Sequence, residues 1–328
     1  MKKFQRISLC VLCLLVVVSI PFAYKKTASG QTFPIQTQKH KFVLTLWHVD
    51  TFEGGVGSRA DFLSSRGVEY SSDGVIIMVK NHTVESLKTA FSKGEIPDMI
   101  SYGVGVEFVL PYLKSLPKTD FLGGEINGKC YAYPWCVGGY YLITKTEDNR
   151  LIDRLFISQN DYNLPFVAKE NHKIEARETV FKKPLDAYVS FLSGKDCAIL
   201  GTQRDIRRLQ SRGVEFFATP LENFSDLIQY VSVTSQSQER YEESLKFLQY
   251  LTAEKCQLQL EKIGMFSAFF SVGQGDYTKG YDFKKVEYTV SPFTHSNELV
   301  EIIDELRREN ITNNSLLRAK NTLKRLKK

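Results

Sequence analysis

The order of apolar and polar residues after position 41 repeats along the first third of the chain. Short apolar runs rich in β-branched residues are typical of buried strands, and the amphipathic stretches between them are typical of helices. The predicted strands are 42–46, 74–79 and 98–101, and the predicted helices are 58–66, 83–92 and a segment after Gly105 that ends near Pro117. This alternation indicates an α/β fold with a mainly parallel, helix-covered sheet.

The alternation breaks between Gly128 and Ile143, where two β-rich runs surround a turn of proline and glycine with no helix between them. This pattern predicts a hairpin-like crossing and a change of domain. Residues 145–183 are polar and weakly patterned, so the sequence predicts no element there. Beyond them the pattern predicts a helix at 185–192, a strand at 196–200, a helix capped by Thr202 and a strand at 214–218.

The last third of the chain is dominated by helical patterns. We predict helices at 239–251 and 253–263, the second of which is stopped by Gly264. Ser296 is predicted to cap a further helix, whose apolar residues follow the i, i+3, i+4, i+7 spacing of an amphipathic helix. Residues 313–328 form a predicted basic terminal helix.

The first 23 residues have the pattern of a targeting segment. Three basic residues precede the apolar run 7–20, which is followed by Pro21-Phe22-Ala23, as in a secretory signal peptide. The alternative is an uncleaved N-terminal anchor, because extension through Tyr24 brings the run close to the ~20 residues of a membrane span. Residues 24–41 are polar and are interpreted as a linker. Both alternatives predict export to the extracellular face of the cell membrane.

Composition narrows the classes of function further. The chain has 328 residues, 43% of them hydrophobic and 24% charged, which is typical of a globular protein of one or two domains. Without the three basic residues of the targeting segment, 40 basic residues face 37 acidic ones. This balance argues against nucleic acid as a partner.

Four cysteines remain after the targeting segment: Cys130, Cys136, Cys197 and Cys256. Export would permit disulfides, and a hairpin could bring Cys130 and Cys136 together, although buried free thiols are the default interpretation. No CxxC pair or histidine-rich cluster accompanies them, so neither a metal site nor a cofactor is predicted.

The first candidate site lies where the first predicted strand ends. Ligands bind in the crevice outside the carboxyl ends of strands in open α/β sheets, so we interpret 47–59 as one wall of a small-molecule site. Trp47 and Trp135, the only tryptophans, could stack on the C–H face of a sugar, or each could be a core or hinge aromatic. Asp50 could accept hydrogen bonds from vicinal hydroxyls, or serve as a turn or capping residue.

The other candidates follow later strands. Tyr140 and Tyr141 alternate in direction, so at most one can face a cleft. Arg204 and Asp205 open a helix, and Arg204 could bind hydroxyls or a carboxylate, or pair with Asp205 or a cross-lobe acid and aid closure. Glu107 starts a predicted helix and is interpreted as a cap more readily than as a ligand contact.

Catalysis has little support in the sequence. The five histidines are scattered, and neither an HExxH nor a GxSxG motif is present. A glycosidase would need two facing carboxylates, for which Asp50 with Asp98 or Glu107 is the pair to test. We therefore expect a protein that is not an enzyme.

Several segments together resemble the family 1 extracellular solute-binding proteins of ABC importers, the maltose-binding-protein-like group. The likeness runs from about Phe42 to the C-terminus, and its most specific segments are 46–50 with the glycine-rich turn, 94–100, 127–134, 191–195 with 201–205, and 247–251. It implies a type II periplasmic-binding-protein-like fold, in which two α/β lobes joined by hinge strands close over a solute. By resemblance, 42–125 with 221–292 form lobe 1, and 126–220 with 293–328 form lobe 2.

Two departures from the family pattern qualify this expectation. The segment between Ile143 and Leu185 is shorter than in typical members, which predicts a shortened second lobe and argues against a large oligosaccharide. The targeting segment also lacks the usual lipid-modified cysteine.

The resemblance implies a binding component that captures a small polar solute, a mono- or disaccharide, and delivers it as a monomer to ABC importer permease subunits. Its closure would be a hinge motion about the strands near Tyr131 and Pro220. The expected ligand-binding residues are Trp47, Asp50, Glu107, Trp135, Tyr140, Arg204 and Asp205. The rival hypotheses are a secreted glycan-acting enzyme and a non-transport sensor or adaptor derived from a binding protein.

Overall fold

The computed structural model describes residues 42–70, 74–119, 123–147, 152–235, 237–269, 281–287, 289–294 and 296–307. The predicted targeting segment, the linker and the basic terminal helix lie outside these residues. Within the described ranges, no helix combines the length and the apolar character needed to cross a bilayer.

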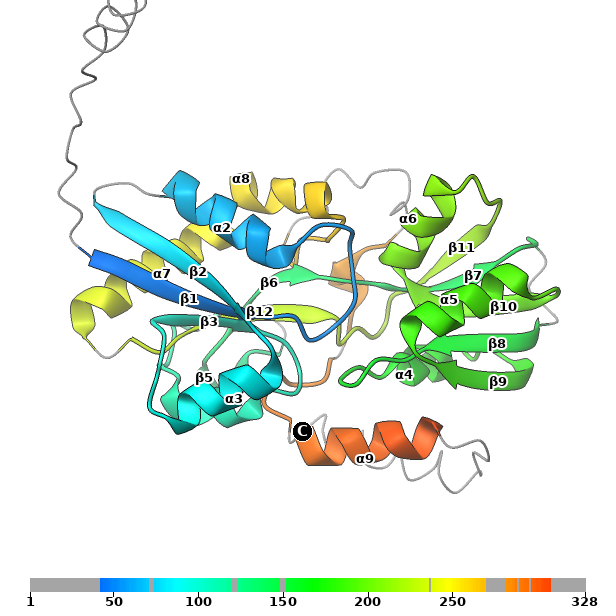
Figure 1. Cartoon of the computed structure of the whole chain (residues 1–328), viewed down its shortest axis with the longest axis horizontal. Helices are drawn as coiled ribbons and strands as arrows, with labels where there is room; N and C mark the ends of the chain where they lie inside the picture. The colour runs from blue at the N-terminus through cyan, green and yellow to red at the C-terminus, as the bar shows by residue number, and fades with distance from the viewer. Residues whose placement is uncertain are drawn as a thin grey trace, which may run out of the picture. The chain divides into compact units, whose positions relative to one another are not determined.

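The first five-stranded sheet has the order β2-β1-β3-β12-β6 (Figure 1). Its strands are β1 (Phe42–Val49), β2 (Val75–His82), β3 (Met99–Tyr102), β6 (Tyr133–Val137) and β12 (Ile228–Val233). β1 pairs in parallel with both β2 and β3, so that Leu46 lies opposite Val79 on one side and Met99 on the other. β12 is antiparallel to β3 and β6. The predicted parallel start of the chain is confirmed.

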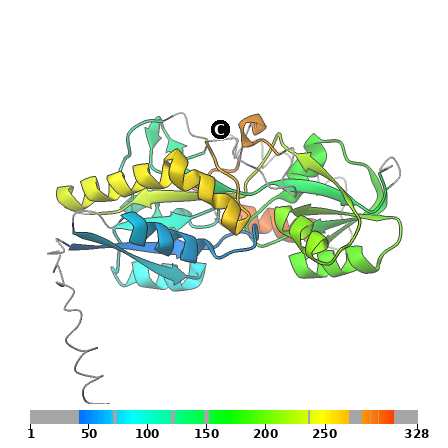
Figure 2. The ribbon, with the colours of Figure 1, turned by 90° about the horizontal axis from the view of Figure 1, so that it is seen from above.

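Helices cover both faces of this sheet. They are α2 (Arg59–Tyr70), α3 (Val84–Ser92), α7 (Gln238–Thr252) and α8 (Glu254–Gln257). Figure 1 shows α2 and α8 on one side of the sheet and α3 on the other. Seen from above, α7 runs beside α2, which it contacts (Figure 2). The predicted N-cap of α3 is confirmed, because the Thr83 hydroxyl accepts a hydrogen bond from the Ser86 amide and Ser86 Oγ caps Thr83 in return.

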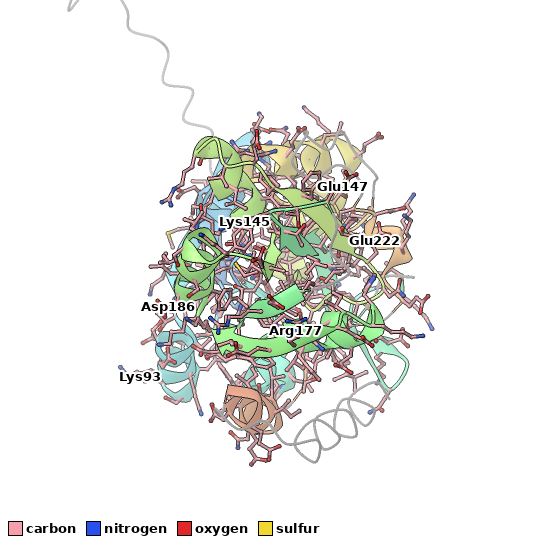
Figure 3. The ribbon with its side chains drawn as sticks, turned by 90° about the vertical axis from the view of Figure 1, so that its right-hand side faces the viewer. Lys93, Lys145, Glu147, Arg177, Asp186 and Glu222 are labelled. Carbon is pink, nitrogen blue, oxygen red and sulfur yellow. The ribbon has the colours of Figure 1, made fainter. Side chains whose placement is uncertain are left out.

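The second five-stranded sheet has the order β11-β7-β10-β8-β9. Its strands are β7 (Tyr140–Thr144), β8 (Ile152–Ser158), β9 (Ala176–Lys182), β10 (Cys197–Thr202) and β11 (Phe217–Leu221), and its helices are α4 (Pro165–Asn171), α5 (Pro184–Ser193) and α6 (Gln203–Ser211). Lys145, labelled in Figure 3, donates to the carbonyls of Leu192 at 3.0 Å and Gly194 at 2.5 Å, which satisfies orphan groups at the end of α5.

Three sequence predictions differ from the structure. Within the stretch for which the sequence predicted no element, the described residues form β8, α4 and β9; β9 is an edge strand whose burial follows no regular alternation. The two runs around Gly138 and Gly139 do not form a hairpin, since β6 pairs in the first sheet and β7 in the second. The helix predicted to end near Pro117 is only a 3₁₀ helix, η1 (Glu107–Tyr112), because Pro111 lacks the N–H that an α-helix needs.

Along the described strands, the chain passes from the first sheet to the second at Gly138 and Gly139 and returns between Leu221 and Ile228. The predicted limits of the two lobes stay a prediction. Lobe 2 was predicted to begin at residue 126, yet β6, which follows that position, pairs in the first sheet. A short hairpin precedes β6: β4 (Glu125–Ile126) and β5 (Lys129–Cys130) are joined by Asn127 and Gly128, both with positive φ, as a tight two-residue turn requires.

The remaining elements follow β12. The predicted helix 253–263 is divided into α8 and the 3₁₀ helix η2 (Leu258–Ile263), and it ends at Gly264 with φ of 65° as predicted. They are followed by η4 (Phe283–Lys285) and α9 (Ser296–Arg307), and α9 contacts β9. All four described cysteines are free and buried, so the default interpretation of the thiols is confirmed and Cys130 is not bridged to Cys136.

Candidate functional site

A chain of polar side chains occupies the carboxyl ends of β1 and β3. His48 Nδ1 lies 3.0 Å from Ser101 Oγ, and His48 Nε2 lies 3.0 Å from Asp50 Oδ1. Arg59, in the first turn of α2, donates from Nε to the same Asp50 oxygen at 2.5 Å. Burial lowers the pKa of His48, which therefore holds these bonds as a neutral ring.

Asp50 is a charged partner in this chain. Burial alone would raise the pKa of Asp50, but the hydrogen bond from His48 and the charge of Arg59 outweigh it and hold that pKa well below its usual range. Its side chain is still 48% exposed. The structure thus supports the turn role, in which Asp50 fixes the loop after β1 to α2.

Both tryptophans lie in the core around the first sheet. Trp47 is 7% exposed and its ring lies 4.5 Å from that of His82 and 6.1 Å from that of Phe91. Trp135 is fully buried, stacks on Phe62 at 5.8 Å and donates from Nε1 to Ser101 Oγ at 2.9 Å. These contacts favour the core alternative for both indoles.

A small pocket, with a volume of about 10 Å³, lies between the two sheets. The loop after β1 and the segment before β12 contribute to it from the first sheet, and the ends of β7, β8 and β10 contribute from the second. Its lining residues are Glu53, Tyr140, Ser158, Asn160, Asn163, Pro184, Thr202, Arg204, Asp205 and Leu227. The pocket therefore brings together three predicted site residues, Tyr140, Arg204 and Asp205. Trp47, Asp50, Trp135 and Glu107 are not part of its lining.

Arg204 spans this pocket. Its Nη1 lies 3.1 Å from Glu53 Oε2, which belongs to the loop after β1. The sequence left open whether Arg204 binds a ligand, pairs with Asp205 or pairs with an acid of the other lobe. In the structure, Arg204 pairs with an acid that follows a strand of the other sheet. The neighbouring Gln203 accepts a hydrogen bond from the Gly139 amide at 3.0 Å, which anchors the start of α6 to the first crossing between the sheets.

The Asp205 side chain is fixed by the N-terminal cap of α6. Its Oδ2 accepts a hydrogen bond from the Thr202 amide at 3.0 Å, and Thr202 completes a capping box. Burial raises the pKa of Asp205 to about 6. Arg208, one turn later, has its Nη1 3.6 Å from Asp205 Oδ1. Asp205 therefore sets the position of Arg204 at the pocket edge.

A buried carboxylate lies beneath the pocket. Asp226, 1% exposed and part of the second crossing, accepts hydrogen bonds from the Tyr140 hydroxyl at 2.6 Å and the Leu164 amide at 2.7 Å. Asn163 donates from Nδ2 to the Asp226 carbonyl at 3.0 Å. Burial raises the pKa of Asp226 to about 6. The hydroxyl of Tyr140 is thus directed at Asp226 and joins the two crossings.

Glu53 falls inside the predicted wall 47–59 but was not singled out, and the sequence did not identify Ser158, Asn160, Asn163 or Asp226 as candidates. Three of them fall in the weakly patterned stretch 145–183. The sequence signal for them was local: Asn160 and Asn163 follow a β-rich run, and asparagine is a typical turn residue. In the structure, the Asn160 side chain accepts hydrogen bonds from the amides of Tyr162 and Asn163 and so stabilises the turn.

The buried acid makes a pH dependence predictable. Because the folded state binds the Asp226 proton more tightly than the unfolded state does, this carboxyl stabilises the fold fully below about pH 4, and the contribution is lost as the pH rises through about 6. We expect Asp226→Asn to become more stable relative to the wild-type protein by roughly 2–3 kcal/mol between pH 4 and pH 7. Urea unfolding of both proteins across this range measures the difference, and a constant difference would contradict the prediction.

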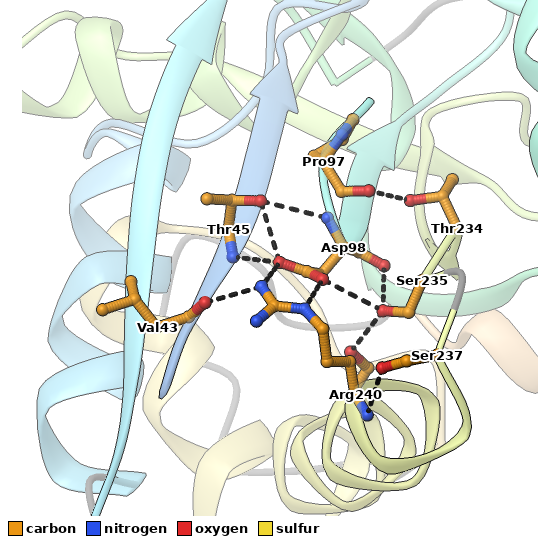
Figure 4. Close-up of polar contacts among 9 residues, drawn as sticks. Val43, Thr45, Pro97, Asp98, Thr234, Ser235, Ser237 and Arg240 are labelled. Atoms are coloured by element: carbon orange, nitrogen blue, oxygen red, sulfur yellow. Dashed lines mark hydrogen bonds and ion pairs between the residues drawn. The ribbon is translucent and has the colours of Figure 1, made fainter. Parts of the chain in front are cut away.

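Asp98, one member of the candidate catalytic pair, is bound elsewhere in the fold. Arg240 donates to it from Nε and Nη2, each at 2.6 Å, and Thr45 donates to it from its amide at 2.8 Å (Figure 4). Burial would raise the pKa of Asp98, but the Arg240 and Thr45 bonds lower it overall. This carboxylate therefore joins β1, β3 and α7. Within the described ranges, no group of three His, Cys, Asp or Glu side chains is arranged to hold a metal ion.

Neither a protein-family model nor a curated protein matches this sequence. Solved structures match its fold. The cyclic α-maltosyl-1,6-maltose binding protein from Arthrobacter globiformis has a TM-score of 0.59 at 13% identity, covering 87% of this chain and 98% of that one. Maltose-bound T. maritima MalE3 has a TM-score of 0.56 at 13% identity, covering 87% and 100%.

The GacH receptor of Streptomyces glaucescens, solved unliganded and with acarbose, has a TM-score of 0.55 at 15% identity, covering 87% of this chain and 98% of that one. At such identities the likeness concerns the fold. The predicted fold class is confirmed: this chain has the two-lobed α/β fold of type II periplasmic-binding-protein-like structures.

Proposed function

We propose that this protein is the substrate-binding component of an ABC importer, exported to the extracellular face of the cell membrane, where it captures a small polar solute and works as a monomer with permease subunits. The observation that carries the proposal is the pocket between the two sheets, which has lining residues from both and an ion pair, Glu53 with Arg204, across it. The two lobes are the units built on the two sheets. We place the hinge at the two crossings between them, of which the second lies next to the predicted Pro220 and the first lies at Gly138 and Gly139 instead of Tyr131.

The contents of the pocket define what it can recognise. Amide, hydroxyl, carboxylate and guanidinium groups converge there, and these groups bind hydroxyl-bearing solutes through directional hydrogen bonds. Its volume of about 10 Å³ has room for about one water molecule, so a solute of mono- or disaccharide size enters only when the two lobes move apart. A solute that touches both lobes would stabilise the closed state through its differential affinity for that state.

The rival of a glycan-acting enzyme has less support. A glycosidase needs two free carboxylates facing one bond. Asp98 is held by Arg240, and the lowered pKa of Asp50 makes it a poor proton donor. Binding therefore explains the arrangement of the described groups better than hydrolysis does.

Arg204→Ala is expected to weaken solute binding by roughly 10- to 100-fold, because a hydrogen bond to a charged group contributes about 1.5–3 kcal/mol. A thermal-shift screen of sugars, amino acids and phosphorylated solutes on the full chain identifies the solute, and calorimetry gives the affinities. Arg177→Ala is the matched control. Arg177 is exposed on β9, where it pairs with Asp153 at 2.9 Å, and Figure 3 shows it on the second sheet. Equal affinities in both variants would remove Arg204 from the site.

A further inference from the structure

The inner wall of the pocket carries a buried acceptor. Asn163 is 1% exposed, and the bond from its Nδ2 to the Asp226 carbonyl fixes the orientation of its amide. Its Oδ1 has no hydrogen-bond partner among the described residues, although Asn163 lines the pocket. Leaving a buried acceptor unpaired costs about 1–3 kcal/mol of free energy. A solute that places a hydrogen-bond donor at this oxygen recovers that free energy when it binds.

Acidic groups outnumber basic ones around this acceptor. The carboxylates are those of Glu53, Asp205 and Asp226, and the guanidinium groups are those of Arg204, paired with Glu53, and Arg208, beside Asp205. In the described part of the chain, no lysine or arginine forms an ion pair with Asp226. A buried carboxylate that lacks a cation is costly, and a positive charge brought close to it recovers part of that cost.

The neutral partners of Asp226 do not supply this charge. Its two oxygens accept hydrogen bonds from the Tyr140 hydroxyl and the Leu164 amide, and its partners Tyr140 and Asn163 line the pocket, whereas Asp226 does not. A cation that contacts Asn163 Oδ1 would lie within one side chain of Asp226. The same position satisfies the unpaired acceptor and compensates the excess carboxylate, so the donor that fits it is an ammonium group.

We infer that the solute is a small hydroxylated primary amine of the amino-sugar class, whose ammonium group donates to Asn163 Oδ1. Its hydroxyl groups then face Ser158, Thr202 and Arg204, which also line the pocket. The solute would be recognised by charge and hydrogen bonding and not by stacking on a tryptophan ring, because neither tryptophan lines the pocket. This inference rests on the proposed function, because it names the class of solute for the same pocket.

Calorimetry of the full chain with three matched sugars tests the inference. D-Glucosamine carries the ammonium group, glucose replaces it with a hydroxyl, and N-acetylglucosamine keeps the nitrogen without its charge. We expect glucosamine to bind at least 10-fold more tightly than either of the others. Equal binding of glucosamine and glucose, or tighter binding of N-acetylglucosamine, overturns the inference.

Two variants locate the effect. Asn163→Leu removes the acceptor and is expected to abolish the preference for glucosamine. Glu53→Gln, at a half-exposed position, removes one carboxylate and is expected to reduce the glucosamine preference several-fold while glucose binding changes less. Glu178→Gln, at an exposed position of β9, is the control and should change neither. Retention of the full preference in both Asn163→Leu and Glu53→Gln contradicts the inference.

Failure of this inference and failure of the proposed function give different results. If a neutral or anionic solute of the wider screen binds and Arg204→Ala weakens it, the pocket captures solutes and only the amine assignment is wrong. If no solute of the screen binds, the proposed function and the inference are both wrong.

Discussion

Replacing Arg240 with methionine is expected to lower the free energy of unfolding by about 2–4 kcal/mol, because the substitution leaves the buried Asp98 carboxylate without its cation. Arg240 makes two bonds of 2.6 Å to Asp98, and its Nη2 also donates to the Val43 carbonyl at 2.7 Å (Figure 4). The Asp98 side chain is only 9% exposed, whereas that of Arg240 is 32% exposed, which keeps the estimate below that for a fully buried pair. Urea unfolding followed by circular dichroism measures the loss.

Two comparisons show whether the paired geometry is responsible. Arg240→Lys keeps the positive charge but cannot form the two-pronged contact, so we expect a smaller loss of about 1–2 kcal/mol. Arg177→Met breaks an exposed ion pair with Asp153 and is expected to cost less than about 1 kcal/mol. A loss for Arg240→Met no larger than that for Arg177→Met would show that the Asp98 cluster does not hold α7 to the sheet.

The second large effect is expected at Trp135. Trp135→Ala should lower the free energy of unfolding by about 3–5 kcal/mol, because it leaves a cavity where a fully buried indole stacks on Phe62. It also removes the donor to Ser101 Oγ. Thermal and urea unfolding give the loss, and solute affinity should change little, because Trp135 does not line the pocket.

Trp135→Phe is the milder companion of that variant. It keeps an aromatic ring beside Phe62 but not the bond to Ser101, which retains its contact with His48 at 3.0 Å. We expect a loss of about 1–3 kcal/mol, from the lost hydrogen bond and the smaller ring. The opposite pattern, unchanged stability with a tenfold loss of solute affinity in Trp135→Ala, would make Trp135 a ligand contact.

Local elements could be predicted wherever their signals lie within a few residues. The capping residues Thr83 and Thr202 and the helix end at Gly264 are where the pattern placed them, because a cap depends on side chains and amides three positions apart. The fold class could be predicted as well, from the alternation of strands and helices together with the order of the resembling segments. Edge strand β9 was not predicted, because the exposure of its residues follows neither a helical nor an alternating period.

Strand pairing could not be predicted from the same signals. β6 and β7 are separated by only Gly138 and Gly139, yet they belong to different sheets. Backbone hydrogen-bonding groups are the same at every residue, so a β-rich run contains no label for its partner strand. The prediction of a hairpin between these two runs was wrong for this reason.

By itself, the sequence determined the helix and strand signals, the α/β class and the position of Arg204 and Asp205 at the start of a helix after a strand. The two-lobed arrangement was what the family resemblance implied. Only the tertiary structure decided that Arg204 meets Glu53, that Asp226 and Asn163 underlie the pocket, and that the tryptophans pack in the core. The physical reason is that a side chain's partners depend on how distant segments pack, whereas its element depends on its neighbours in the chain.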